Sequence, residues 1–281
     1  METRILSPTK EVIIGNWHPT VLIGERINPA GKKNLAQALK AGNMEIVRGE
    51  ALAQAQAGAD ILDISVGAFG VDEVAMLPQA VQAVLDTIDI PLCLDSTNPE
   101  ALAAALKVYK GKPLINSVTG EERSLVQVLP LVRNHRAAVI GLVQDDEGIP
   151  KSADRRVAIA RKVVQRAEAV GIAREDIIID CLASAVGADT SSGLVTLETI
   201  RRVKAELGVN ITLGASNISF GLPDRDVINN TLIPIAIEAG VTCLMVDVAR
   251  VRPAVLAADL ILNRDKRARR YIEMYRQRSK R

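Results

Sequence analysis

Polar side chains stand at or just after the ends of several short apolar runs, and they carry most of the chemistry that the sequence offers. Two carboxylates, Asp95 and Asp180, and two amides, Asn116 and Asn217, share this placement. A carboxylate accepts two parallel hydrogen bonds from adjacent N–H donors, whereas an amide both donates and accepts. If the fold brings these four residues together, they would suit a flat, polar ligand with several N–H donors.

The elements that must position these residues are short β-branched runs alternating with longer Ala-rich amphipathic stretches. This alternation is typical of parallel strands joined by crossover helices. Eight such units predict a single closed (β/α)8 TIM barrel rather than an open sheet. The predicted strands are Val21–Gly24, Asp60–Ser65, Pro91–Asp95, Pro113–Ser117, Ala137–Val143, Asp176–Cys181, Ile211–Ala215 and Thr242–Val246.

One domain is expected to span residues 1–281, because 281 residues suit one barrel and no Gly-, Ser- or Pro-rich linker interrupts the series. Residues 1–20 form a hairpin-like extension before the barrel. We expect Glu11–Gly15 to pair with Val21–Gly24 around Asn16–Thr20 and to close the barrel floor.

In a barrel of this kind the carboxyl ends of the strands form the active-site face. Most of the predicted strands end on polar residues, which include Glu25, Asn28, Asp63, Asp95, Asn116, Asp180, Ser216, Asn217 and Asp247. Helix N-caps are the alternative reading, since Ser, Thr, Asp and Asn are favoured there. Both readings stay open for Ser96, Thr97, Asn98, Ser117 and Thr119.

The capping explanation is weaker for Asp95, Asn116, Asp180 and Asn217, because such groups without a partner in a barrel mouth would be costly. Asp247 has Arg250 and Arg252 nearby as partners. A pterin fits the remaining groups, since its 2-amino group and ring N–H groups form an edge of donors for a carboxylate. A sugar, a small acid or an amino acid stays open on these residues alone.

Four longer strings give a more specific signal. They resemble those of methyltetrahydrofolate:corrinoid protein methyltransferases, in the right order over roughly residues 20–250. The resemblance implies a pterin-binding barrel related to the folate domain of cobalamin-dependent methionine synthase and to dihydropteroate synthase. The strings are Gly24-Glu25-Arg26-Ile27-Asn28, Cys93-Leu94-Asp95-Ser96-Thr97, Ile115-Asn116-Ser117 and Gly214-Ala215-Ser216-Asn217-Ile218-Ser219-Phe220.

The resemblance also assigns roles. Asp95, Asn116 and Asp180 would hold the pterin ring, and Asn217 would reach the N5 atom that bears the methyl group. Asp63, Ser216, Glu25 and Asn28 complete the expected pterin-binding set. Two positions depart from the family pattern: Ser65 stands where Asn is usual, and Cys181 follows Asp180 where Pro is usual.

The implied activity moves a methyl group between N5 of tetrahydrofolate and the cobalt of a corrinoid carried by a partner protein. An amide is no general acid, so Asn217 would accept a hydrogen bond from protonated N5 in the transition state. The proton would come from water or a relayed carboxylate. The pocket is compatible with transfer in either direction, and a homodimer through barrel helices is expected by resemblance.

Three alternatives are weaker. A zinc-activated mechanism needs clustered His and Cys, but His18 and His135 are far from any cysteine in the sequence, so no bound metal is expected. A dihydropteroate synthase-like enzyme would place an Arg/Lys pair after strand seven, where this chain has Asn217 and Ile218. A non-catalytic folate-binding barrel would keep the same pocket without the chemistry.

Composition narrows the classes further. Apolar residues form 48% of the chain and aromatics 2%, which suits a barrel and leaves few platforms for stacking bases, so no nucleic-acid partner is expected. Residues 264–281 hold nine basic and two acidic residues, a tail that could meet solvent, an acidic partner or a second subunit. Three scattered cysteines and the lack of a signal or membrane-spanning pattern predict a soluble, cytoplasmic protein.

Overall fold

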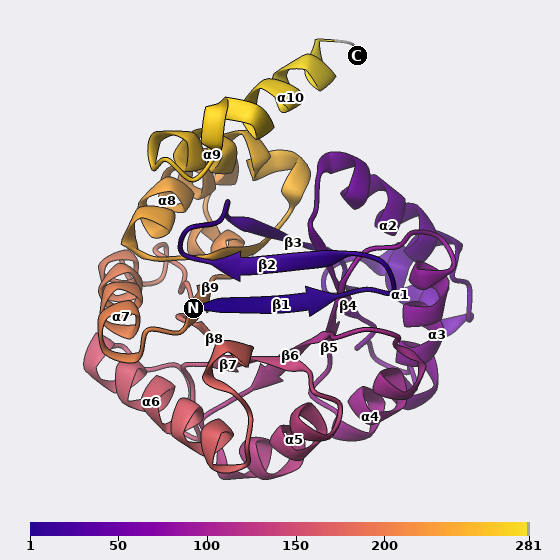
Figure 1. The fold of residues 1–281 in the computed structure, drawn as a ribbon. Coiled ribbons are helices and arrows are strands. Elements are labelled where there is room, and N and C mark those ends of the chain that lie inside the picture. The colour runs from indigo at the N-terminus through magenta and orange to yellow at the C-terminus, as the bar shows by residue number, and fades with distance from the viewer. Residues whose placement is uncertain (280–281) are drawn as a thin grey trace.

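The computed structural model describes residues 1–279 and places a closed barrel of parallel strands over a small hairpin (Figure 1). The hairpin pairs β1 (Glu2–Leu6) with β2 (Glu11–Gly15) in antiparallel register. The larger sheet has eight strands within these residues, in the order β10-β3-β4-β5-β6-β7-β8-β9. They are β3 (Val21–Ile27), β4 (Ile61–Ser65), β5 (Leu92–Asp95), β6 (Leu114–Val118), β7 (Ala138–Leu142), β8 (Ile177–Asp180), β9 (Asn210–Thr212) and β10 (Cys243–Val246).

The sheet closes between β9 and β10. The backbone N–H of Thr242 donates to the carbonyl of Ile211 at 2.9 Å, and that of Met245 donates to Leu213 at 3.1 Å. A parallel bridge between Gly214 and Met245 completes the seam. The predicted (β/α)8 barrel is therefore confirmed.

Helices follow the strands and form the outer ring (Figure 1). Side-chain caps begin three of the described helices: Asp72 accepts from the N–H groups of Val74 and Ala75, Asn98 accepts from Glu100, and Ser152 accepts from Arg155. Short 3₁₀ turns lie at Arg174–Asp176, Ala215–Ser219 and Lys266–Ala268. The α-helices are α1 (Lys33–Lys40), α2 (Glu45–Ala57), α3 (Glu73–Leu85), α4 (Pro99–Val108), α5 (Glu122–Asn134), α6 (Ala153–Ala169), α7 (Ser192–Leu207), α8 (Arg225–Ala239), α9 (Val248–Ile261) and α10 (Arg269–Arg278).

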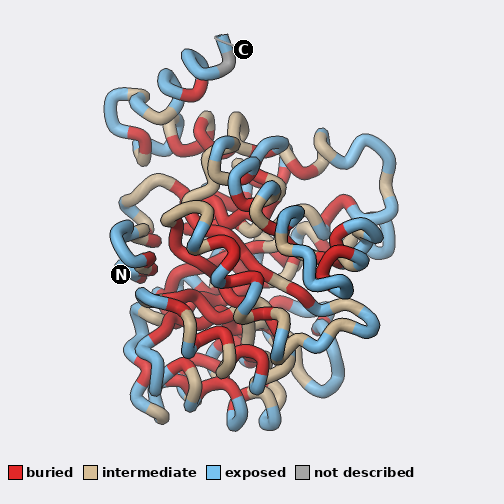
Figure 2. The backbone as a smooth tube through the Cα atoms, turned by 90° about the vertical axis from the view of Figure 1, so that its right-hand side faces the viewer, coloured by how far each residue is buried: buried red, intermediate tan, exposed pale blue. Residues whose placement is uncertain are grey.

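Two apolar layers form the core, and buried segments fill the middle of the molecule (Figure 2). The larger layer lies between strands and helices. The smaller one fills the barrel interior, where Ile23, Ile61 and Cys93 meet Ile5 and Ile14 of the hairpin. Asn210 ties the hairpin to the barrel, because its Nδ2 donates to Thr3 Oγ1 at 2.9 Å and to the carbonyl of Ile14 at 3.0 Å.

The inward-facing residues of the strands change from apolar to polar along each strand. Alternate residues share one face of a strand, so Ile61 is followed by Asp63 and Cys93 by Asp95. Leu114 is followed by Asn116 in the same way, and Ile178 by Asp180. The barrel is thus dry at the hairpin end and polar at the carboxyl ends of its strands.

Two details of the predicted strands were wrong. Glu11–Gly15 pairs with β1 rather than with Val21–Gly24, because β3 is already paired on both sides by β4 and β10. The seventh predicted run stops at Thr212, and Ala215 begins a 3₁₀ turn instead of ending a strand.

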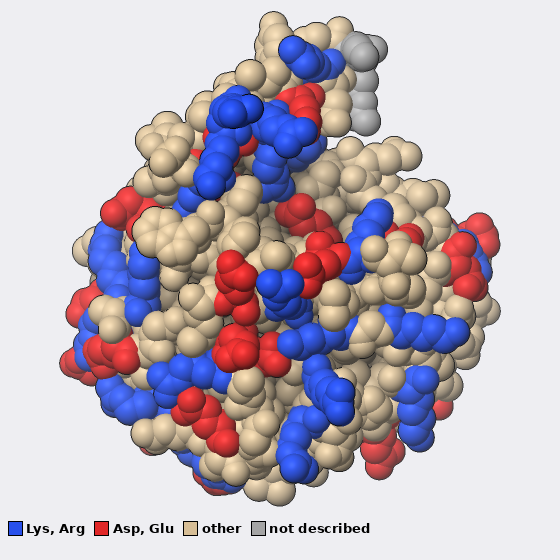
Figure 3. All heavy atoms as spheres, viewed as in Figure 1, with Lys and Arg blue, Asp and Glu red and all other residues tan. Residues whose placement is uncertain are grey.

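The first part of the basic tail packs against the barrel. Arg264 donates to the carbonyls of Val241 and Ile237, both at 3.2 Å, and Arg270 pairs with Asp60 at 3.4 Å. Helix α10 then extends away from the barrel, and basic side chains gather around it (Figures 1 and 3). Residues 280 and 281 of the predicted tail lie outside the described residues. Across residues 1–279, every helix is too short or too polar to span a bilayer.

Candidate active site

Four strands bring the predicted ring-binding residues to one end of the barrel. Asp63 on β4 and Asn116 on β6 meet across β5, with Asn116 Nδ2 donating to Asp63 Oδ1 at 3.3 Å. The same Nδ2 lies 3.7 Å from the sulfur of Met245 on β10. Both N–H bonds of this amide therefore have acceptors within the protein, which leaves Asn116 Oδ1 as an acceptor for a ligand.

Burial makes the carboxylates of this cluster reluctant to ionise. Burial raises the pKa of Asp95 to about 6, against a hydrogen bond from Ser65 that lowers it. The pKa of Asp63 is raised well above its ordinary value, first by burial and then by the negative charge of Asp95. A thiol hydrogen bond from Cys93 only partly offsets these effects.

Asp180, at the end of β8, is buried and held by backbone donors. The N–H of Leu182 donates to Asp180 Oδ1 at 2.8 Å, and the N–H of Gly214 also donates to this carboxylate. Burial nevertheless raises the pKa of Asp180 to about 6. A ligand that supplied further N–H donors would favour its charged form.

Asn217 lies in the 3₁₀ turn after β9 and folds back over the strand end. A Cβ built on Gly214 would sit 3.2 Å from Asn217 Nδ2, so the amide rests directly above that glycine. Gly214 is also the residue that hydrogen-bonds Asp180. The amide is exposed rather than buried, which leaves it accessible to a ligand over Asp180.

Glu25 and Ser216 join across the β3 and β9 ends, with Ser216 Oγ donating to Glu25 Oε1 at 3.0 Å. Both line a hollow of about 260 Å³ in the barrel mouth, together with Arg225, Asp247 and Arg250. The pKa of Glu25 is raised, first by burial and also by the charge of Asp247, against the hydrogen bond from Ser216 that lowers it.

Other strand-end residues have local structural partners. Asn28 Oδ1 accepts from the N–H of Ala30 at 2.9 Å and so closes a turn. Asp247 pairs with Arg26 and Arg250, each at 3.5 Å. The pairing with Arg250 had been expected from its nearness in the sequence. Asn98 acts as a helix cap, and Thr119 accepts from the N–H of Glu121 at 3.3 Å.

Three residues near the cluster were not recognised from the sequence. Ser65, which stands where the family pattern has Asn, hydrogen-bonds Asp95. Cys93, a buried free cysteine, donates to Asp63. The alternation of inward-facing residues on β4 and β5 could have identified Ser65 and Cys93. Met245 is the third residue, and no sequence pattern indicated that it reaches Asn116 from β10.

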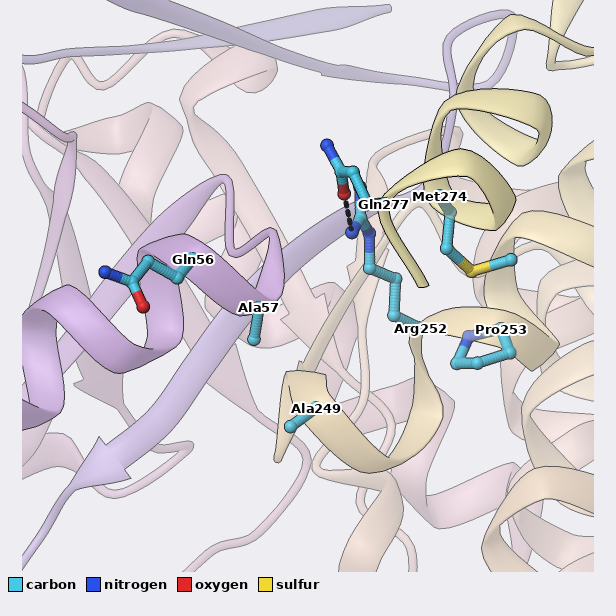
Figure 4. Close-up of a pocket in the computed structure, with 7 residues that line it drawn as sticks. All are labelled: Gln56, Ala57, Ala249, Arg252, Pro253, Met274 and Gln277. Atoms are coloured by element: carbon cyan, nitrogen blue, oxygen red, sulfur yellow. Dashed lines mark hydrogen bonds between the residues drawn. The ribbon is translucent and has the colours of Figure 1, made fainter. Parts of the chain in front are cut away.

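A second hollow, of about 220 Å³, lies outside the barrel between α2, α9 and α10 (Figure 4). Arg252 crosses it to Gln277, with Nη1 3.3 Å from Oε1. Its walls include Met274 and Pro253 and contain none of the strand-end carboxylates. Within residues 1–279, no group of three or more His, Cys, Asp or Glu side chains is placed to hold a metal ion.

Comparison with known proteins defines the class. Residues 24–247 match the family described as pterin binding enzyme, so the chain belongs to the pterin-binding enzyme family. The match runs from the start of the first strand-end motif to Asp247 and contains the whole polar cluster.

Among individual relatives, the chain is similar to a methylcorrinoid:tetrahydrofolate methyltransferase of Eubacterium limosum. The two are 30% identical over 92% of this chain and 96% of that protein. A methionine synthase of Mycobacterium tuberculosis is 33% identical over 83% of this chain, which spans only 21% of that longer protein. The family resemblance predicted from the sequence motifs is confirmed.

Solved structures agree on the fold. A dihydropteroate synthase of Xanthomonas albilineans superposes with a TM-score of 0.72, covering 93% of this chain and 99% of that one at 22% identity. A dihydropteroate synthase of Yersinia pestis gives a TM-score of 0.71 at 16% identity, again over 93% of this chain. At these identities the likeness concerns the barrel alone.

Proposed function

We propose that this protein transfers a methyl group between N5 of tetrahydrofolate and the cobalt of a corrinoid protein. The observation that carries the proposal is the grouping of ligand acceptors beside an accessible amide, Asn217, at one barrel end. The similarity to a methylcorrinoid:tetrahydrofolate methyltransferase over nearly the whole chain supports the same activity.

The pterin ring would bind through its N–H donors. Asp95, Asp180 and Asn116 Oδ1 all offer oxygen acceptors, and a pterin edge presents adjacent donors to them. Asp63 lies one layer deeper, where burial raises its pKa well above the ordinary value, and its role would be to fix the Asn116 amide. Methyl transfer from N5 is easier when N5 is protonated, because the departing group is then a neutral amine rather than an amine anion. The site must therefore favour protonated N5.

Asn217 would meet that demand in the transition state. Its amide lies over Gly214, whose N–H donates to Asp180, and the proposal puts N5 of a bound pterin next to this amide. Its oxygen can accept from N5–H⁺ and stabilise the charge that develops there. Glu25 would relay the proton, because it accepts a hydrogen bond from Ser216, the residue next to Asn217, and burial raises its pKa.

The corrinoid, carried by its own protein, supplies the cobalt that gives or takes the methyl group. It must approach the polar barrel end, and the exposed surface there includes both phenylalanines of the chain. Phe69 follows β4 and is 97% exposed, and Phe220 follows the 3₁₀ turn and is 68% exposed. We therefore propose that these loops contact the corrinoid protein. The outer barrel helices would then form the interface of a homodimer, and the protein would act in the cytoplasm.

Spectrophotometry of cobalamin tests the proposal, because the cobalt oxidation and ligation state reports turnover. Mixing the protein with methyltetrahydrofolate and cob(I)alamin should form methylcobalamin, and methylcobalamin with tetrahydrofolate should run the reverse. Tight folate binding without either conversion would indicate a non-catalytic folate-binding barrel. Formation of dihydropteroate from a pterin pyrophosphate and 4-aminobenzoate would instead identify a dihydropteroate synthase-like enzyme.

A further inference from the structure

A buried arginine lies beneath the loop that follows Asp180. Arg156 projects from the first turn of α6 and is 2% exposed. Its guanidinium joins the loop after β7 to the loop after β8. It donates to the carbonyl oxygens of Pro150 at 2.8 Å, Cys181 at 3.0 Å and Leu182 at 2.7 Å, and to Ser184 Oγ at 3.1 Å.

These acceptors are carbonyl and hydroxyl oxygens rather than carboxylates. Burial of a guanidinium without a directly bonded anion is unfavourable and lowers the pKa of Arg156, while the charge of Asp180 raises it. A neutral side chain could fill the same space without that cost. A neutral side chain lacks the planar, five-donor guanidinium, which can donate to several backbone oxygens at once.

One of these bonds leads directly to the pterin site. Arg156 Nη1 binds the carbonyl oxygen of Leu182, and the N–H of Leu182 binds Asp180 Oδ1 at 2.8 Å. Leu182 has a φ of 52°, in the left-handed region that a leucine seldom adopts. Such a conformation persists where surrounding contacts enforce it. Thr196 adds a second bond to the same carbonyl, from Oγ1 at 3.1 Å.

We infer that Arg156 is a positioning residue. It fixes the backbone of Cys181 and Leu182 on either side of the Leu182 N–H, and through that N–H it fixes the carboxylate of Asp180. The inference rests on the proposed function insofar as Asp180 binds the pterin. It also accounts for Cys181, which stands where the family pattern has proline. Cys181 lacks the ring that restricts a proline backbone, and the Arg156 guanidinium holds its carbonyl instead.

Carboxyl NMR of the ligand-free protein tests the inference without reference to folate. The Asp180 signal is assigned by its loss in Asp180→Asn and is titrated in wild type, Arg156→Lys and Arg156→Gln. Loss of the enforced Leu182 bond should raise the Asp180 pKa by about 0.5–1 unit in Arg156→Lys and by more in Arg156→Gln, which also loses the charge. The other ionisable groups that sense Asp180 are the thiols of Cys181 and Cys243, whose pKa values burial raises out of this range.

Arg155→Lys is the matched control, because Arg155 is the preceding residue on α6 and pairs with Asp145 and Glu147 at the surface. Its Asp180 titration should match wild type. If the Arg156 variants do not fold, Thr196→Val removes one bond to Leu182 and should shift the titration in the same direction by a smaller amount. Titration of Asp180 with the wild-type midpoint in folded Arg156→Gln, or in Thr196→Val if neither Arg156 variant folds, overturns the inference.

Calorimetry then separates this inference from the proposed function. Wild type that fails to bind methyltetrahydrofolate contradicts the proposed function, whatever the NMR result. Where wild type binds, Arg156→Lys should bind about three- to tenfold more weakly near pH 7 and recover part of the loss at higher pH. An equal loss at every pH would mean that Arg156 only supports the fold.

Discussion

The side-chain amide of Asn116 donates to the carboxyl group of Asp63, with Nδ2 3.3 Å from Oδ1. The sulfur of Met245 takes up the other side of the same Nδ2 at 3.7 Å. These contacts engage the nitrogen of the amide within the protein, which leaves Asn116 Oδ1 as an acceptor for the proposed pterin ligand. The barrel end therefore presents acceptors, and the ligand must bring the donors.

Removal of the Asp180 carboxylate should weaken folate binding. In Asp180→Ala, methyltetrahydrofolate affinity should fall about ten- to hundredfold, because one charge-assisted pair contributes about 1.5–3 kcal/mol. Isothermal titration calorimetry measures the change. Asp189→Ala is the control, because the Asp189 carboxylate accepts hydrogen bonds from Ser191 in an exposed turn. Unchanged affinity in folded Asp180→Ala would refute the assignment of this residue to the pterin.

Folate affinity should rise with pH through about 6, where Asp95 and Asp180 both titrate in the free protein. The sign follows from their raised pKa values. Below about pH 6 these groups are largely protonated and must lose protons to accept from the pterin, so binding releases protons. Calorimetry in buffers of different ionisation enthalpy measures this release. Proton uptake on binding near pH 6 would contradict the account.

Asp63 should limit the stability of the protein. Its folded-state pKa is raised, so the folded state holds a proton that the unfolded chain releases above about pH 4. Asp63→Asn should increase the free energy of unfolding at pH 8, and the gain should vanish below about pH 4. Denaturant titrations at the two pH values measure it. Asp154→Asn, at an exposed carboxylate, should show no comparable gain.

The barrel and its polar end could be predicted from the sequence because both depend on local patterns. The β-branched runs fix the strands, and alternation along β4 and β5 places Asp63 and Asp95 on the inner face. The hairpin pairing could not be predicted this way. By local pattern β2 could pair with either β1 or β3. Both edges of β3 are instead occupied by the parallel strands β4 and β10, which local pattern does not reveal.

Side-chain contacts between distant strands were also beyond sequence reasoning. Met245 has no polar neighbour in sequence, yet it reaches Asn116 across the barrel. Arg156 lies in the first turn of an ordinary amphipathic helix, and only its contacts with the folded loop after Asp180 give it a role.

A homodimer is expected in solution through the barrel helices, since the polar barrel end must stay open for the corrinoid protein. Light scattering should give about twice the 30.1 kDa of one chain at micromolar concentration. Phe220→Ala should leave that mass unchanged while it raises KM for the corrinoid protein, and Trp17→Ala, at an 89% exposed position beside the floor hairpin, should change neither. A clean monomer would remove the homodimer from the account.

The most direct test of the account is single-turnover methyl transfer to cob(I)alamin by Asn217→Ala at saturating methyltetrahydrofolate. In the proposed mechanism Asn217 would strengthen its hydrogen bond only as N5 becomes cationic, so its loss should slow transfer about 10²–10³-fold, while the folate dissociation constant changes much less. Near-normal turnover in Asn217→Ala, or a defect that saturating folate cures completely, would show that N5 is activated by another group.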